Sequence, residues 1–260
     1  MGKRIRCPRL QAGVKNQATN GEPAMIAPQS CVDSDPQVRT QKARKVSSIL
    51  QGLAPLGAGG SALDVGCGAG FVADHLRRLG WSVVGLDIAD YRATAGFDFI
   101  LGRAETLPFP SESFSIVVSN HVIEHVADAA AHLREVRRVL APGGLAYVAT
   151  PNRFALLEPH YKLPFLSWLP RGLADAYMRL LRRAEKYDVF PLTRGRLLRE
   201  AARAGLRCDD MTPRMVAATA AVERSPLAKL GRALPAGVLR WLSYLSPTFV
   251  FVMRRVEIEG

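Results

Sequence analysis

Between residues 61 and 150 the sequence alternates short apolar segments with amphipathic ones, and this alternation restricts the fold more than any other feature. Segments typical of strands lie at 61–65, 81–87, 97–101, 114–120 and 145–150, and segments typical of helices lie at 71–80 and 129–140. Strands that alternate with helices need crossover connections, which make neighbouring strands parallel. We therefore expect an α/β fold built on a doubly wound, mostly parallel sheet.

Two segments interrupt this alternation, and we expect both to be helical lid insertions. The first, at about 153–191, is aromatic, basic and contains proline, and the second lies at about 213–246. Between and after them the pattern predicts a helix over 193–205 and strands near 206–211 and 248–256. The sheet should thus have seven strands.

The N-terminal residues have a different composition. Residues 1–36 are rich in Pro, Gly, Asn, Gln and Ala and show no apolar period, which is typical of a disordered tail. A helix is expected over 38–53. We expect one folded domain over residues 37–260.

Charge is unevenly distributed along the chain. Of 260 residues, 35 are Lys or Arg and 23 are Asp or Glu, which gives a net charge of +12. Residues 41–152 are neutral, whereas residues 153–260 hold 19 basic and 10 acidic side chains. The four cysteines form no C-x-x-C pair, and no apolar stretch is long enough to span a membrane. We expect a cytoplasmic protein, with a peripheral position at a membrane as an alternative.

A glycine-rich turn joins the first strand to the next helix. The sequence ALDVGCGAG (62–70) contains Gly66, Gly68 and Gly70, and glycines there let a ligand approach the backbone and the helix N-terminus. A dinucleotide site would have G-x-G-x-x-G, but here the third glycine comes one residue early. Asp64 is placed to meet a cationic amine, and Asp87, at the end of the second strand, to meet ribose hydroxyls.

An amine and a ribose without a pyrophosphate describe S-adenosylmethionine. Four segments in the same order resemble the class I S-adenosylmethionine-dependent methyltransferases, in particular the ubiquinone- and menaquinone-biosynthesis-like (type 11) group. They are ALDVGCGAG, VVGLDIA, GRAETLPFPSESFSIVVSNHVIEHV and REVRRVLAPGGLAYVATPN. The resemblance covers about 45–152 well and the two insertions not at all. It implies a Rossmann-like fold, methyltransferase activity and S-adenosyl-L-methionine as cofactor.

The resemblance also implies which residues bind the cofactor. They are Asp64, Gly66, Cys67, Gly68, Gly70, Asp87, Ile88, Ala104, Glu105 and Asn120. The segment after the third strand is expected to hold adenine. Arg103 stands there where the family usually has Asp, and a guanidinium cannot accept a hydrogen bond from the adenine amino group. Glu105 or a backbone carbonyl would then serve as the acceptor.

The sequence His121-Val-Ile-Glu124-His125 carries a competing signal. It matches the H-x-x-E-H pattern of a class of zinc proteases, in which two histidines share one helical face. The segment follows a buried strand, however, and no separate helical domain supplies a third ligand. We expect no metal at this site, and keep a metallohydrolase and metal-assisted methyl transfer as alternatives.

Transfer to a hydroxyl acceptor would need a general base. The candidates are His121, which follows the fourth strand, and His160, in the first insertion. For either histidine, a hydrogen-bonded structural role is the alternative. The expected reaction is O-methylation of a small apolar or lipid-linked acceptor.

Two further interpretations of function stay open. A nucleic-acid methyltransferase acting on amino groups would need a D/N/S-P-P-aromatic loop, but the chain has Ser119-Asn120-His121-Val122, so nucleic acid is not expected as a partner. A cofactor-binding scaffold without catalysis is the other alternative. The basic, apolar insertions favour peripheral contact with an anionic membrane, or else simply roof the active site.

Overall fold

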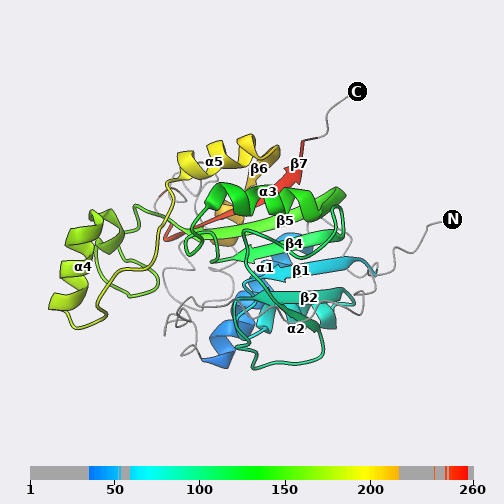
Figure 1. The fold of residues 1–260 in the computed structure, drawn as a ribbon, viewed down its shortest axis with the longest axis horizontal. Helices are drawn as coiled ribbons and strands as arrows, with labels where there is room; N and C mark the ends of the chain where they lie inside the picture. The colour runs from blue at the N-terminus through cyan, green and yellow to red at the C-terminus, as the bar shows by residue number, and fades with distance from the viewer. Residues whose placement is uncertain are drawn as a thin grey trace.

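The computed structural model describes residues 35–51, 53, 59–216, 237, 244 and 246–256 (Figure 1). Its helices are α1 (Pro36–Gln51), α2 (Phe71–Arg78), α3 (Ala129–Val139), α4 (Arg171–Leu180) and α5 (Arg194–Arg203), with a 3₁₀ helix η2 (Leu166–Trp168). Its strands are β1 (Ser61–Val65), β2 (Ser82–Asp87), β3 (Asp98–Leu101), β4 (Phe114–Asn120), β5 (Leu140–Pro151), β6 (Leu206–Asp210) and β7 (Thr248–Arg255).

The seven strands form one sheet in the order β3-β2-β1-β4-β5-β7-β6. The first five are parallel, and β7 runs antiparallel to both β5 and β6. The chain winds outward from β1 to β3 and then restarts beside β1 with β4, so the order reverses between β1 and β4. This confirms the predicted doubly wound, mostly parallel sheet of seven strands.

Helices cover both faces of the sheet. Figure 1 shows α3 and α5 on one face, where they contact each other, and α1 with α2 on the other. Ala62 of β1 packs in the apolar cluster that includes α1 and α2, whereas Leu63 and Val65 pack in the cluster with α3 and α5. A strand covered on both faces must be apolar throughout. Asp64 is the one ionisable residue of this fully buried strand.

Two element boundaries differ from the sequence-based prediction. The helix expected over 38–53 begins at Pro36, where the lack of an N–H has no cost in the first turn, and Asp35 accepts a hydrogen bond from the Gln37 N–H. The strand expected over 145–150 begins at Leu140, because Leu140 pairs with Phe114 ahead of a bulge in the β4–β5 ladder.

The first insertion has a small apolar core of its own and projects beyond the ends of β4 and β5 (Figure 1). Its helix α4 confirms the helical spacing of the sequence, but the buried stripe is Ala174 and Met178. Leu173 and Leu180 of the same helix are 60% and 78% exposed.

Most of the predicted tail (1–36) and of the second insertion (213–246) lies outside the described residues. Among the described helices, none has the length and apolar character needed to cross a membrane.

Candidate active site

Parallel pairing places the carboxyl ends of β1, β2, β3 and β4 along one edge of the sheet. In the paired registers Val65 lies beside Leu86 of β2 and Ser119 of β4, and Asp87 lies beside Leu101 of β3. The point where strand order reverses lies between β1 and β4, and ligands of open α/β sheets bind in the crevice at such a point. The glycine turn leaves β1 at this position.

The glycine turn brings its backbone close to two neighbours. Gly66 has a φ of +64°, and a Cβ on it would lie 2.5 Å from the Val122 side chain, so only glycine fits there. Gly68 also has a positive φ, but a Cβ there would meet nothing within 4 Å. The backbone at Gly68 therefore borders open space that a ligand can enter, and Gly70 leads directly into α2.

Asp64, two residues before Gly66, has a buried carboxyl oxygen without a hydrogen-bond partner among the described residues. This atom is Oδ2, and the whole side chain is almost fully buried. Burial raises the pKa of Asp64 to about 7, despite a hydrogen bond from the Ala73 backbone. An unpartnered buried carboxyl group would gain stability from a ligand ammonium group. The site therefore suits a cationic amine.

Asp87 ends β2 and is held by the turn. Its Oδ2 accepts the Gly68 N–H at 2.8 Å and its Oδ1 accepts the Ile88 N–H at 2.7 Å. Burial raises the pKa of Asp87, although these backbone hydrogen bonds act in the opposite direction. The Ala89 backbone also donates to this carboxylate, which keeps acceptor capacity for a ligand hydroxyl. The hydrogen bonds fix the carboxylate in the orientation that a ribose would need.

Two apolar side chains stand beside Asp87 with nearly half of their surface exposed. Ile88 and Leu101 are each 46% exposed, and each follows a partly buried strand residue. A flat aromatic base would cover both side chains. Leu101 was not among the predicted site residues, although it is the last residue of the neighbouring parallel strand β3.

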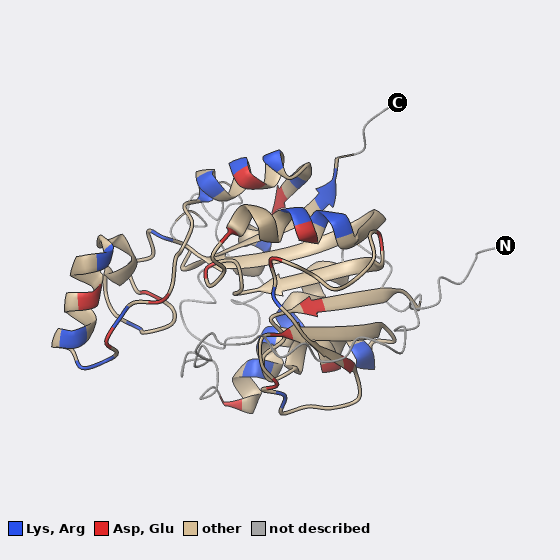
Figure 2. Ribbon diagram, viewed as in Figure 1, with Lys and Arg blue, Asp and Glu red and all other residues tan. Residues whose placement is uncertain are grey.

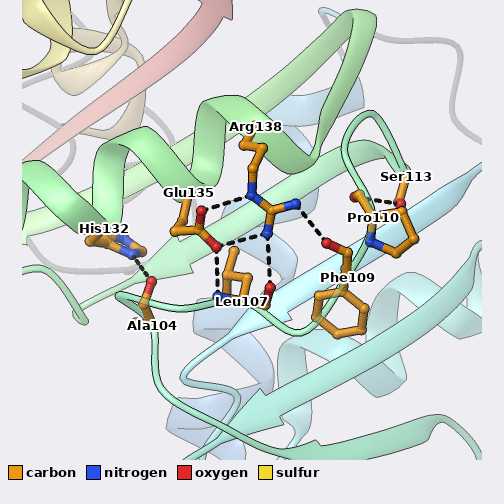
Figure 3. Close-up of polar contacts among 8 residues, drawn as sticks. All are labelled: Ala104, Leu107, Phe109, Pro110, Ser113, His132, Glu135 and Arg138. Carbon is orange, nitrogen blue, oxygen red and sulfur yellow. Dashed lines mark hydrogen bonds and ion pairs between the residues drawn. The ribbon is translucent and has the colours of Figure 1, made fainter.

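The segment after β3 lies against α3. Ala104 is buried, and its carbonyl faces His132 (Figure 3). Glu105 accepts a hydrogen bond from the Ala127 N–H at 3.1 Å, and Arg103 lies 3.8 Å from the same carboxylate oxygen. One oxygen of Glu105 thus already accepts a hydrogen bond from the loop that precedes α3. Arg103, which stands where the family usually has an acid, forms an ion pair with the same oxygen.

The loop after β4 carries His121 and Glu124. Asn120 is the last residue of β4 and pairs with Ala149, and the His121 N–H then donates to the Ala149 carbonyl. His121 has a φ of +61°, a strained conformation for a residue other than glycine. Its Nδ1 lies 3.1 Å from Glu124 Oε1, so Nδ1 carries the proton and Nε2 is left as a proton acceptor.

Glu124 is completely buried beneath three histidines. Thr150 donates to its second oxygen at 3.1 Å, and His160 Nε2 lies 3.7 Å from the oxygen that His121 contacts. Burial alone would raise the pKa of Glu124, but the hydrogen bond from His121 and the nearby His125 and His160 hold it below its ordinary value. Glu124 is therefore an ionised carboxylate inside the protein.

His160 comes from the first insertion and is held between two carboxylates. Its Nδ1 lies 2.9 Å from Glu158 Oε1 and its Nε2 faces Glu124. Burial disfavours its charge, but the bond to Glu158 and the Glu124 charge together raise the pKa of His160. Both ring nitrogens of His160 are thus engaged, in contrast to His121. The short Glu158-Pro-His160 turn gave no periodic signal in the sequence.

The helix that the H-x-x-E-H zinc-protease pattern requires does not form. Residues 121–127 are turns rather than a helix, so His121 and His125 share no helical face. In the described part of the chain, His121, Glu124 and His160 are the group whose potential ligand atoms lie within 4.8 Å of one another. Each of the three already has a hydrogen-bond or ion-pair partner in the protein.

Comparisons with known proteins agree with this geometry. A family model described as a methyltransferase domain matches residues 63–148. The matched part, 86 of the 260 residues, is similar to a methyltransferase domain. The match spans the glycine turn, Asp87 and the loop after β4, which are the elements that form the site. S-adenosylmethionine is the cofactor of this class of domain, and the buried free oxygen of Asp64 and the open approach at Gly68 fit it.

Curated relatives carry the name ubiquinone biosynthesis O-methyltransferase. The one from Parvibaculum lavamentivorans is 36% identical over 129 residues, which is 44% of this chain and 50% of the relative. The one from Rhizobium rhizogenes is 40% identical over 136 residues, 47% of this chain and 54% of the relative. The chain thus spans about half the length of the curated relatives it matches.

The fold is also found among solved structures. An S-adenosylmethionine-dependent methyltransferase from Mesorhizobium loti superimposes with a TM-score of 0.57 at 18% identity, over 83% of this chain and 100% of that one. At this identity the likeness shows the fold alone.

Replacing Asp87 by Ala should weaken the binding of S-adenosylhomocysteine by about 1–3 kcal/mol, because two ribose hydroxyls lose a charged acceptor. Isothermal titration calorimetry measures this directly. The matched control is Asp98→Ala, which removes an exposed carboxylate at the opposite end of the neighbouring strand β3 and should leave the affinity unchanged. Equal affinities for Asp87→Ala and the wild type would contradict the assignment of Asp87.

Proposed function

We propose that the protein is an O-methyltransferase that acts on a hydroxyl group of a small apolar or lipid-linked acceptor. The observation that carries this proposal is the His121–Glu124 pair at the end of β4. The pair lies beside the edge of the sheet that holds Asp64, Gly68 and Asp87, which we call the cofactor edge. The names of the curated relatives, which include O-methylation, support the same reaction.

The residues of the cofactor edge have separate tasks. Asp64 would hold the amine of S-adenosylmethionine, Asp87 its ribose, and Ile88 with Leu101 the apolar face of its base. When bound, the cofactor supplies an activated methyl group on a positively charged sulfur. The chain's own contribution is to hold the acceptor in line with that group and to keep water out.

His121 is proposed as the general base. Its Nε2 is the unprotonated ring nitrogen and takes the proton of the acceptor hydroxyl as the oxygen becomes nucleophilic. The imidazolium that forms is stabilised by the ionised Glu124, which lies 3.1 Å from Nδ1. Glu124 is completely buried, so its charge is little screened by solvent. Glu124 thus orients His121 and keeps it in the basic tautomer.

His160 has a different task in this proposal, since both of its nitrogens face carboxylates. The sequence offered it as a second base, but its place between Glu158 and Glu124 favours a link between the insertion and the core. A backbone hydrogen bond from Phe190 to the Glu124 carbonyl, at 2.8 Å, ties the other end of the insertion to the same residue. His160 and Phe190, from the two halves of the insertion, thus both contact Glu124, the partner of the proposed base.

His121→Asn should lower kcat by about 10²–10⁴-fold, because the acceptor proton loses its base. Glu124→Gln should lower it less, since the base stays but loses its charged partner. Both variants should bind S-adenosylhomocysteine as the wild type does. The assay follows methyl transfer to hydroxylated aromatic compounds with and without an apolar chain.

A chelator should leave the wild-type rate unchanged in that assay, because the proposed base needs no metal. Loss of activity with EDTA, restored by a divalent ion, would contradict this.

Full activity of His121→Asn would remove His121 from catalysis. Tight cofactor binding without transfer to any acceptor would favour the scaffold interpretation.

The acceptor is further proposed to be met at an anionic membrane surface. Much of the exposed apolar surface of the described residues lies in the first insertion, on its aromatic loops and on α4. Phe165 and Trp168 stack edge to face while each is about half exposed, and Phe165 keeps a strained φ of +55°. Exposed aromatic and leucine side chains of this kind are typical of a membrane interface.

Basic side chains lie beside this apolar surface. Figure 2 shows Lys and Arg along α4 and the loop that follows it. The exposed ones are Arg171, Arg179, Arg182, Arg183 and Lys186. Each cation near an anionic bilayer contributes about 1 kcal/mol, and this attraction falls with salt. Apolar and basic groups therefore support binding to the same kind of surface.

The protein should sediment with vesicles that contain anionic lipid at low salt and be released at high salt. The double variant Leu173→Glu/Leu180→Glu should lose this association, because both side chains are exposed and their replacement leaves the core intact. Val38→Glu, at an exposed apolar position on α1, is the matched control and should still sediment. Absence of wild-type sedimentation at low salt would leave the insertion as a lid alone and favour a soluble acceptor.

A further inference from the structure

The buried side chain of His132, on α3, bridges two segments that are distant in sequence. Its Nδ1 lies 3.0 Å from the Ala104 carbonyl oxygen, and its Nε2 lies 2.9 Å from Ser119 Oγ. A carbonyl oxygen only accepts hydrogen bonds, so Nδ1 carries the proton and Nε2 accepts the Ser119 hydroxyl proton. Burial lowers the pKa of His132, which keeps the ring neutral.

Two more side chains of α3 continue this contact with the segment after β3 (Figure 3). Glu135 accepts the Leu107 N–H at 2.7 Å, and Arg138 donates to the carbonyls of Leu107 and Phe109. Glu135 and Arg138 are also joined to each other by an ion pair. His132, Glu135 and Arg138 occur at every third position, so they line one side of the helix. The main chain at 104–109 is held by a helix instead of a neighbouring strand.

The two partners of His132 belong to the two halves of the site. Ala104 lies in the segment expected to hold adenine. Ser119 lies in β4, immediately before Asn120 and the base His121, and its backbone pairs with Val65 at the start of the glycine turn. Ser119 and His132 are both completely buried. The His132 ring therefore links Ala104 to a buried position of the central strand β4.

We infer that His132 is a positioning residue, which acts through Ala104 to hold the adenine segment in its binding conformation relative to β4. The inference rests on the proposed function, which places the cofactor base beside Ala104. Without the Nδ1–H donor the buried Ala104 carbonyl has lost its partner, and the segment must be ordered when the cofactor binds. That ordering reduces cofactor affinity and leaves the reaction of the bound complex unchanged.

Two amide substitutions separate the two ends of the ring. In His132→Asn the side-chain amide N–H falls near the position of Nδ1, so it can still donate to Ala104. In His132→Gln the amide reaches the position of Nε2 and Ser119, and the Ala104 contact is lost. Calorimetry with S-adenosylhomocysteine should show about tenfold weaker binding for His132→Gln, whereas His132→Asn recovers most of the affinity.

The kinetic expectation is equally specific. His132→Gln should raise the KM for S-adenosylmethionine by about the same factor with little change in kcat, since the base is untouched. The matched control is the same pair of substitutions at His75 of α2, whose Nε2 lies 3.0 Å from Ser47 Oγ in a helix contact. Neither His75 variant should change cofactor affinity.

A purely structural role for His132 would lower the melting temperatures of the Asn and Gln variants and give them equal cofactor affinities. That result would overturn the inference. Asp87→Ala, measured in parallel, separates this failure from failure of the cofactor site. If Asp87→Ala weakens binding and His132→Gln does not, the positioning role is wrong and the proposed function stands. If the wild type itself does not bind S-adenosylhomocysteine, both are wrong.

Discussion

The parallel pairing of β1 with β2 and β4 is the constraint on which the rest of the structure depends. It places Asp64, Asp87 and His121, which are 57 residues apart from first to last, at one edge of a single sheet. Because β1 is covered on both faces, its backbone cannot shift without disturbing two apolar layers. The glycine turn therefore starts from a fixed point, and the ligand-binding groups need little rearrangement.

Glu124 is the second feature on which the proposed site depends, and burying its charge costs free energy. A buried carboxylate is stable only when it is paired and hydrogen-bonded. Here the partners are His121, Thr150 and His160, so one charge joins the proposed base, strand β5 and the insertion. Removing any one partner leaves part of the Glu124 charge uncompensated. The contact that His160 of the insertion makes with Glu124 is therefore coupled to the protonation state of His121.

The sequence was sufficient for the doubly wound, mostly parallel sheet of seven strands, because short apolar segments that alternate with amphipathic ones are local signals. It was insufficient for contacts made by loops. No local pattern indicates that His132 and Glu135 of α3 bind the backbone of a segment 28 residues earlier in the chain. Nor does spacing alone reveal that Ala174 and Met178 of α4 are buried while Leu173 is exposed.

The most direct test of the central claim is the proton balance of cofactor binding. The pKa of Asp64 is about 7 in the free protein, and a ligand ammonium group beside it should lower that value. Titration calorimetry with S-adenosylhomocysteine in buffers of different ionisation enthalpy should therefore show release of close to one proton at about pH 6, falling to none above about pH 8. Binding without proton release across this range would contradict the placement of the amine at Asp64.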